Sequence, residues 1–109
     1  MVDLEVYLER IRSAVEARVD PDFVIIARTD ARQANSFGGE NAGKQAFEEG
    51  VRRLKAALEA GADMAFIESP RTEEECVTLV KELAPKPVLI NILPHICRKP
   101  IIQYLDTFY

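Results

Sequence analysis

Residues 23–27 form an apolar run, Phe-Val-Ile-Ile-Ala, which stops at Arg28 and is followed closely by Asp30. The run does not alternate between apolar and polar residues, so it predicts a strand buried on both faces, as in a parallel sheet. In open α/β sheets and α/β barrels, ligands bind at the carboxyl ends of the strands. Arg28 and Asp30 are therefore candidates for substrate contact rather than for simple solvation.

The same pattern recurs twice further along the chain. Residues 64–67, Met-Ala-Phe-Ile, run into Glu68, and residues 87–90, Pro-Val-Leu-Ile, run into Asn91. The intervening segments have helical periodicity, and strands that alternate with helices indicate an α/β fold with parallel strands and right-handed crossovers. We expect strands near residues 22–28, 63–68 and 87–91, and helices near residues 3–18, 44–60 and 72–84.

Residues near the predicted helix ends favour these boundaries. Asp3 is a plausible N-cap for the first helix, and Gly61 is a natural C-cap for the second. Thr72 begins the third helix, whose first turn holds three glutamates that are favourable against the helix dipole. Apolar residues at three- and four-residue steps predict the buried faces: Leu4, Val6, Leu8, Ile11, Ala14 and Val15; Phe47, Val51, Leu54 and Leu58; Val77, Leu79, Val80 and Leu83.

Composition excludes several classes of protein. The 109 residues allow one domain at most. The net charge is −4, and the basic residues are scattered among acidic ones. We therefore expect no nucleic-acid partner and no membrane partner, because there is no basic stripe and no apolar run near the ~18 residues of a membrane span. Cys76 and Cys97 lack metal-ligand spacing, and without a recognisable signal peptide we expect reduced thiols and a cytoplasmic location.

The polar residues after the three strands suit an anion site. The guanidinium of Arg28 can bind a carboxylate or phosphonate through parallel N–H donors. Glu68 could hold a metal-bound water, orient Arg28 or act as a base, and Asn91 can donate to a substrate oxygen. A purely structural alternative stays open, in which Arg28 pairs with Asp30 or Glu68 as a strand-end salt bridge and Asn91 caps a turn. Asp30 is equally compatible with capping a loop.

Three segments together resemble the isocitrate lyase and phosphoenolpyruvate mutase superfamily. They are Ile-Ala-Arg-Thr-Asp-Ala at residues 26–31, the stretch Glu-Ala-Gly-Ala-Asp-Met-Ala-Phe-Ile-Glu at residues 59–68, and Pro-Val-Leu-Ile-Asn at residues 87–91. The resemblance implies a (β/α)8 barrel, Mg²⁺ as cofactor, and formation or cleavage of C–C or P–C bonds in small 2-oxoacid-type or hydroxy-tricarboxylate substrates. It further implies that Arg28 binds the substrate carboxylate, that Glu68 is the active-site glutamate, and that Asn91 binds substrate.

The chain is short for this resemblance. A barrel of this type needs ~250 residues, and the three strands look like only a portion of one, over residues 1–93. Residues 94–109 form a tail that diverges from the family pattern. The family's metal-binding aspartates and its loop with the catalytic cysteine belong to earlier strands, so no metal ligand is expected in this chain. A full-length form is expected to be a homo-oligomer, cytoplasmic or mitochondrial.

Two hypotheses follow from the sequence. The chain derives from a Mg²⁺-dependent lyase or phosphonomutase and retains part of its active site, or it is a non-catalytic partial barrel that associates with a partner through exposed sheet edges. Other candidates carry little chemistry. His95 is the only histidine, Cys97 lacks a partner base, and the glycine-rich segment at residues 38–43 lacks the ending of a phosphate loop.

Overall fold

The chain alternates helices and strands in a computed structural model that describes residues 1–31, 43–68 and 70–91. In chain order the elements are α1 (Leu4–Ala17), β1 (Ile26–Thr29), α2 (Lys44–Glu59), β2 (Met64–Ile67), α3 (Glu73–Leu83) and β3 (Val88–Leu89). This order confirms the predicted α/β class. The predicted tail at residues 94–109 lies outside the described residues, and the domain boundary at residue 93 stays a prediction.

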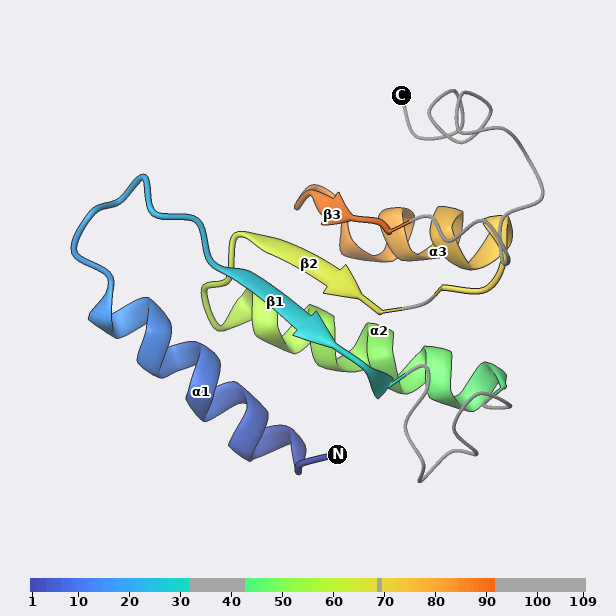
Figure 1. The fold of residues 1–109 in the computed structure, drawn as a ribbon, viewed down its shortest axis with the longest axis horizontal. Coiled ribbons are helices and arrows are strands. Elements are labelled where there is room, and N and C mark those ends of the chain that lie inside the picture. Colours follow the sequence, from blue (N-terminus) through green and yellow to red (C-terminus); the bar gives the residue numbers. More distant parts are fainter. Residues whose placement is uncertain (32–42, 69, 92–109) are drawn as a thin grey trace.

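The three strands form one parallel sheet in the order β1-β2-β3. Arg28 lies opposite Phe66, and Phe66 lies opposite Leu89. Figure 1 shows all three arrows pointing the same way, with α2 alongside β1 and β2 and with α3 alongside β3. All three strands therefore end at the same edge of the sheet, as predicted.

The helix ends follow the sequence with small differences. The side chain of Thr72 caps α3 by accepting a hydrogen bond from the amide of Glu75 at 3.1 Å. Asp3 occupies the N-cap position of α1, but its side chain makes no capping hydrogen bond. Gly61 has φ +116° and follows the C-cap Ala60. Gly61 thus takes the left-handed position just past the helix, which glycine adopts without the strain that a side chain would cause.

The core lies between the helices and one face of the sheet. Phe47 and Leu54 of α2 are buried as predicted, whereas Val51 and Leu58 are only partly buried at its margin. The small residue Gly50 lies in the middle of this contact, where an added Cβ would come within 2.7 Å of Ile67 Cδ1. Small residues on α2 let the helix approach the sheet closely. The fully buried members of the core are Ala27, Ala46, Leu54, Ala57, Ala62, Ala65, Ile67 and Leu79.

The prediction of a first strand buried on both faces is wrong. β1 begins only at Ile26, and the residues Phe23 and Ile26 are 65% and 44% exposed. Along β1 exposed and buried residues alternate, because the described helices cover only one face of the sheet. The expected strand at residues 87–91 is likewise reduced to Val88–Leu89. An apolar run therefore marks a strand here without marking burial on both sides.

The predicted inner faces of α1 and α3 are partly corrected. Val6 and Ala14 of α1 are exposed, because α1 contacts α2 along one narrow stripe centred on Leu8 and Ile11. In α3 the buried residues are Cys76, Leu79 and Leu83, while Val77 and Val80 are half-buried.

Arg18 and Asp63 close the edge of the sheet where the strands begin. Arg18 Nη1 donates to Asp63 Oδ2 at 2.6 Å and to the carbonyl of Phe23 at 3.1 Å. The same Asp63 oxygen accepts the amide of Ile25 at 2.9 Å, which lowers the pKa of Asp63, with a smaller contribution from Arg18. Sequence reasoning missed this ion pair, since its members lie 45 positions apart.

Candidate active site at the carboxyl ends of the strands

The structure brings Arg28, Glu68 and Asn91 together at one edge of the sheet. Arg28 is the third of the four residues of β1, Glu68 follows β2 directly, and Asn91 comes two residues after β3. Arg28 Nη2 lies 3.6 Å from Glu68 Oε2, and Asn91 Nδ2 lies 3.4 Å from both carboxylate oxygens of Glu68. Glu68 is thus the central member of the cluster and contacts both of the others.

Arg28 is held from three directions. Its Nε donates to Asp30 Oδ1 at 2.8 Å and its Nη2 donates to Asp30 Oδ2 at 3.2 Å. The guanidinium carbon also lies 5.2 Å from the centre of the Phe66 ring, within the range of a cation–π contact. The hydrogen bond to Asp30 is the largest cause that raises the pKa of Arg28, and the charges of Asp30 and Glu68 add to it. Arg28 therefore remains a cation while half of its side chain faces solvent.

Glu68 and Asn91 are more buried than Arg28. The Glu68 side chain is 19% exposed, and its backbone amide donates to the carbonyl of Thr29 at 3.0 Å, which anchors the end of β2 to β1. Asn91 Oδ1 is buried and accepts no hydrogen bond from the described residues. A buried amide oxygen without a partner is uncommon in folded proteins. This oxygen is therefore the least satisfied polar atom of the cluster.

The strand-end salt bridge of the structural alternative is present, since Arg28 pairs with both Asp30 and Glu68. Asn91 is held by Glu68 through its side chain. These contacts do not exhaust the donors of Arg28, because a guanidinium carries five N–H groups and no described residue accepts from Nη1. The pairing is compatible with a substrate role, and the roles of Arg28, Glu68 and Asn91 stay predictions.

The formal charges of this cluster are one cation, Arg28, and two carboxylates, Asp30 and Glu68. The local sum is −1, so an anionic substrate needs positive charge from elsewhere to bind strongly. Within the described ranges no group of three or more histidine, cysteine, aspartate or glutamate residues could hold a metal ion. The cluster offers one central carboxylate, already engaged by a cation. It does not by itself make a Mg²⁺ site.

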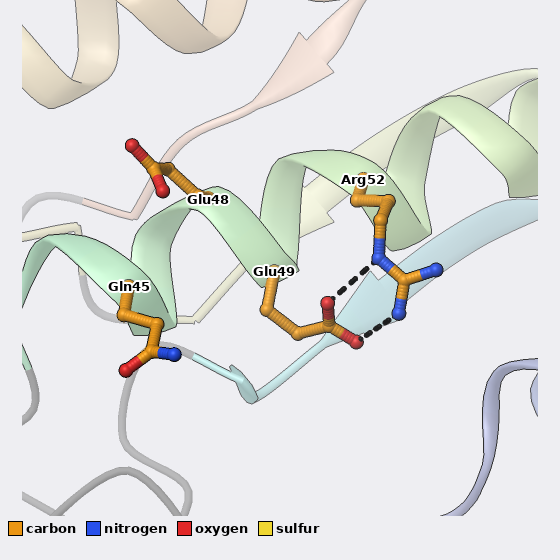
Figure 2. Close-up of a pocket in the computed structure, with 4 residues that line it drawn as sticks. All are labelled: Gln45, Glu48, Glu49 and Arg52. Atoms are coloured by element: carbon orange, nitrogen blue, oxygen red, sulfur yellow. Dashed lines mark hydrogen bonds and ion pairs between the residues drawn. The ribbon is translucent and has the colours of Figure 1, made fainter.

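A separate hollow lies on the first half of α2. Figure 2 shows the four residues that line it, Gln45, Glu48, Glu49 and Arg52, with Glu49 and Arg52 pointing toward each other. Their two hydrogen bonds measure 2.7 and 2.8 Å. The bond from Arg52 is the largest cause that lowers the pKa of Glu49. Glu49 is thus an ionised carboxylate whose oxygens are engaged by Arg52 and Arg53.

Sequence reasoning underestimated two residues of the cluster. The sequence offers Asp30 as a partner of Arg28, but it does not predict that the two bonds pair one carboxylate with one edge of the guanidinium. Phe66 reads in the sequence only as part of an apolar strand, although two-residue periodicity places it on the same face as Glu68. Its position opposite Arg28 comes from the parallel register, which the sequence does not specify.

Most of the other sequence candidates fall outside the described part of the chain. His95, Cys97 and residues 38–42 lie outside the described residues, and Cys76 is buried on α3. In the described part of the chain no helix is long and apolar enough to cross a membrane.

Comparison with known proteins identifies the family. A family model described as phosphoenolpyruvate phosphomutase matches residues 1–106. The chain belongs to the isocitrate lyase and phosphoenolpyruvate mutase superfamily. This superfamily chain is 40% identical over 93 residues to 2,3-dimethylmalate lyase of Eubacterium barkeri, which covers 85% of the chain and 28% of the relative. It is 39% identical over 92 residues to 2-methylisocitrate lyase of Shewanella oneidensis, with coverages of 84% and 28%.

Solved structures of the superfamily share the fold of this chain. A crystal structure of 2,3-dimethylmalate lyase matches with a TM-score of 0.80 at 34% identity, covering 98% of this chain and 36% of that one. Oxaloacetate acetylhydrolase in complex with its product oxalate matches with a TM-score of 0.66 at 40% identity, with coverages of 81% and 28%. The superfamily chain described here spans less than a third of the length of the two curated relatives.

Proposed function

We propose that this chain is the portion of a superfamily lyase or phosphonomutase that binds the substrate carboxylate. The observation that supports this most strongly is the convergence of Arg28, Glu68 and Asn91 at the carboxyl ends of three parallel strands, within 3.6 Å of one another through Glu68. In α/β barrels this edge holds the active site. The proposed substrate is a small 2-oxoacid or a hydroxy-tricarboxylate.

The three side chains have complementary roles in this proposal. Arg28 binds a carboxylate through the donors that Asp30 leaves unused, chiefly those on Nη1. Asn91 holds Glu68 in place and, after a rotation of its amide, can donate to a substrate oxygen. Glu68 accepts a proton from the substrate hydroxyl or keeps Arg28 oriented. The catalytic assignment is to Glu68, and the substrate-binding assignment is to Arg28, Glu68 and Asn91.

The proposed cofactor is Mg²⁺, bound by residues outside this chain. The cluster in the described residues does not fit a metal site, and its charge sum of −1 leaves a need for added positive charge near an anionic substrate. In the whole protein Mg²⁺ would supply that charge and would polarise a 2-oxo group. The proposal thus includes upstream strands that complete a barrel and contribute metal ligands. Assembly of the full-length protein into a homo-oligomer is part of the same proposal.

The test is turnover by a longer protein in which the upstream strands and the cysteine loop of a relative precede this chain. We expect pyruvate release from 2-methylisocitrate or oxaloacetate with Mg²⁺, or conversion of phosphonopyruvate. Arg28→Ala should lower kcat/KM by at least about tenfold, since it removes a charge-assisted hydrogen bond to the substrate. Arg12→Ala, on the exposed face of α1, is the matched control and should leave turnover unchanged. Equal activity of the two variants would contradict the proposal.

A second candidate function rests on the open face of the sheet. Ile26 and Leu89 are 44% and 42% exposed, and the half-buried Met64 and Phe66 lie between them in register. This face could bind a partner without any catalysis. Sedimentation of the isolated chain discriminates this candidate, because Ile26→Thr with Leu89→Thr should then reduce association, and Val19→Thr, at a fully exposed position in the loop before β1, should not.

A further inference from the structure

Asp30 holds Arg28 by a pair of hydrogen bonds to one edge of the guanidinium. The Nε and Nη2 atoms face the two oxygens of the Asp30 carboxylate at 2.8 and 3.2 Å. Side chains at positions i and i+2 of an extended segment lie on the same face, so Asp30 reaches Arg28 without a turn of the backbone. This two-point contact sets the plane of the guanidinium as well as its position.

The remaining contacts of Arg28 fix the same orientation. Phe66 lies beneath the guanidinium at 5.2 Å, and Glu68 Oε2 lies 3.6 Å from Nη2. Phe66 thus covers one face of the guanidinium, Asp30 occupies its Nε edge, and Glu68 lies on the side of Nη2. The donors on Nη1 are left without an acceptor among the described residues, directed away from Asp30.

The exposure of the Arg28–Asp30 pair indicates that it contributes little to the stability of the fold. The Arg28 and Asp30 side chains are 51% and 56% exposed, and ion pairs at such positions contribute little to folding. The charge of Asp30 also opposes anion binding, since it lowers the positive potential around Arg28. A carboxylate at this position therefore weakens the attraction of the site for an anion. The fixed orientation of the Arg28 guanidinium is the effect that offsets this loss.

We propose that Asp30 is a positioning residue, which holds Arg28 with its Nη1 donors toward the carboxylate of the substrate. The inference rests on the proposed function, because it assumes that Arg28 binds that carboxylate. Asp30 itself does not touch the substrate. It removes the rotamer freedom of a long side chain before the substrate arrives, so less entropy is lost on binding.

Charge and positioning predict opposite effects for one substitution. Asp30→Ala removes a negative charge beside the anion site, so charge alone predicts tighter binding of an anion. If Asp30 positions Arg28, the same substitution weakens binding despite the more favourable charge. Oxalate is a suitable probe, because it carries two carboxylates and little else.

The experiment is a titration with sodium oxalate of the ¹⁵N-labelled longer protein that tests the proposed function, with Mg²⁺ present to supply the positive charge that the cluster lacks, followed by amide and arginine Nε–Hε resonances. We expect Asp30→Ala to raise the oxalate Kd by about two- to tenfold, the cost of ordering one long side chain. The Arg28 Nε–Hε group should also become as mobile as that of the exposed Arg12. Asp22→Ala removes the same charge from the loop before β1, and it should leave Kd and Arg28 mobility unchanged.

Asp30→Asn is a second variant that keeps one acceptor for Nε, and its Kd should fall between those of the wild type and Asp30→Ala. Amide spectra of all variants report whether the fold is retained. Tighter or unchanged oxalate binding by Asp30→Ala, while Arg28→Ala weakens it, overturns the positioning role and leaves the proposed function standing. If Arg28→Ala does not weaken oxalate binding, or if the wild type does not bind oxalate, the proposed function fails and the inference fails with it.

Discussion

Two buried polar groups lie on the neighbouring helices α1 and α2. Tyr7 of α1 has a buried hydroxyl that makes no hydrogen bond to the described residues, and burial raises the pKa of Tyr7 to about 12 against the opposing charge of Arg53. Arg53 of α2 is 6% exposed and donates to Glu49 at 2.8 Å. The cation is therefore paired, whereas the hydroxyl keeps the cost of lost hydration.

Tyr7→Phe removes this hydroxyl and keeps the ring. We expect the free energy of unfolding at neutral pH to be unchanged or to rise by up to about 1 kcal/mol, because an unpartnered buried hydroxyl is lost. The folded-state pKa lies above the ordinary value of 10.0, so wild-type stability should fall as pH rises from 10 toward 12, and Tyr7→Phe should lack that part of the loss. Urea unfolding at several pH values measures both effects. A clear loss of stability at neutral pH would contradict the prediction.

Asp63 gives the opposite pH dependence. Its folded-state pKa is lowered below the ordinary value of 3.8, chiefly by the hydrogen bond from the amide of Ile25 and then by Arg18. The stabilisation is therefore present above pH 3.8 and is lost as pH falls further through the folded-state pKa. Asp63→Asn should lower the Tm at neutral pH and flatten its decline in acid, as measured by circular dichroism. Asp22→Asn is the control and should follow the wild type, whereas parallel acid curves for Asp63→Asn would contradict the role of this carboxylate.

At the scale of elements, the approach of α2 to the sheet depends on one glycine. Gly50 is buried in the middle of α2, where glycine is unfavourable for the helix itself. A Cβ at this position would lie 2.7 Å from Ile67 Cδ1 and 3.7 Å from Thr29 Cγ2. The helix thus gives up local propensity for close contact with β1 and β2. The two strands in this contact, β1 and β2, are the ones that place Arg28 and Glu68 at the candidate site.

Gly50→Ala should lower the free energy of unfolding by about 1 kcal/mol, because the clash with buried Ile67 outweighs the gain in helix propensity. Ile67→Val removes the clashing Cδ1 and alone should cost about 1 kcal/mol. In the Gly50→Ala background the same change should cost less or stabilise the protein. Urea unfolding of the four proteins measures the coupling between the two sites. Additive effects would show that the helix moves away from the sheet instead.

At the scale of the whole molecule, the chain has a covered face and an open face. The helices bury the side chains of Ala27, Ala65 and Ile67, while Ile26 and Leu89 remain exposed on the other side. Arg28 projects from this same open face, where exposed and buried residues alternate along β1. The candidate site therefore lies on the face of the sheet that the described helices leave open. The incomplete enclosure bears directly on activity.

The isolated 109-residue chain should show no measurable lyase, decarboxylase or phosphonomutase turnover. Catalysis of this kind needs carboxylates that fix Mg²⁺ and a site closed from water, and the described cluster supplies neither. The assays are pyruvate release from oxaloacetate and 2-methylisocitrate with Mg²⁺, and conversion of phosphonopyruvate. The longer protein with the upstream strands restored is the positive control. Turnover by the short chain that disappears on Arg28→Ala would refute this prediction.

The sequence alone determined the order of elements and the position of the polar residues at strand ends. Apolar runs that stop at Arg28, Glu68 and Asn91 mark strand ends, and helical periodicity between them requires parallel crossovers. Since parallel strands end at a common edge, convergence of these three residues followed before any coordinates. Local signals such as Thr72 before three glutamates, and Gly61 after α2, also placed helix ends to within one residue.

Only the tertiary structure decided which faces are buried and which charges meet. The apolar run at residues 23–27 has the composition of a doubly covered strand, yet burial depends on a second layer that the described residues do not supply. The register that sets Phe66 opposite Arg28 and the Arg18–Asp63 pair join residues far apart in sequence. The periodicity of apolar residues indicates whether a segment is a helix or a strand and which of its faces is apolar. Contacts between distant segments depend on how the elements pack, which no local pattern encodes.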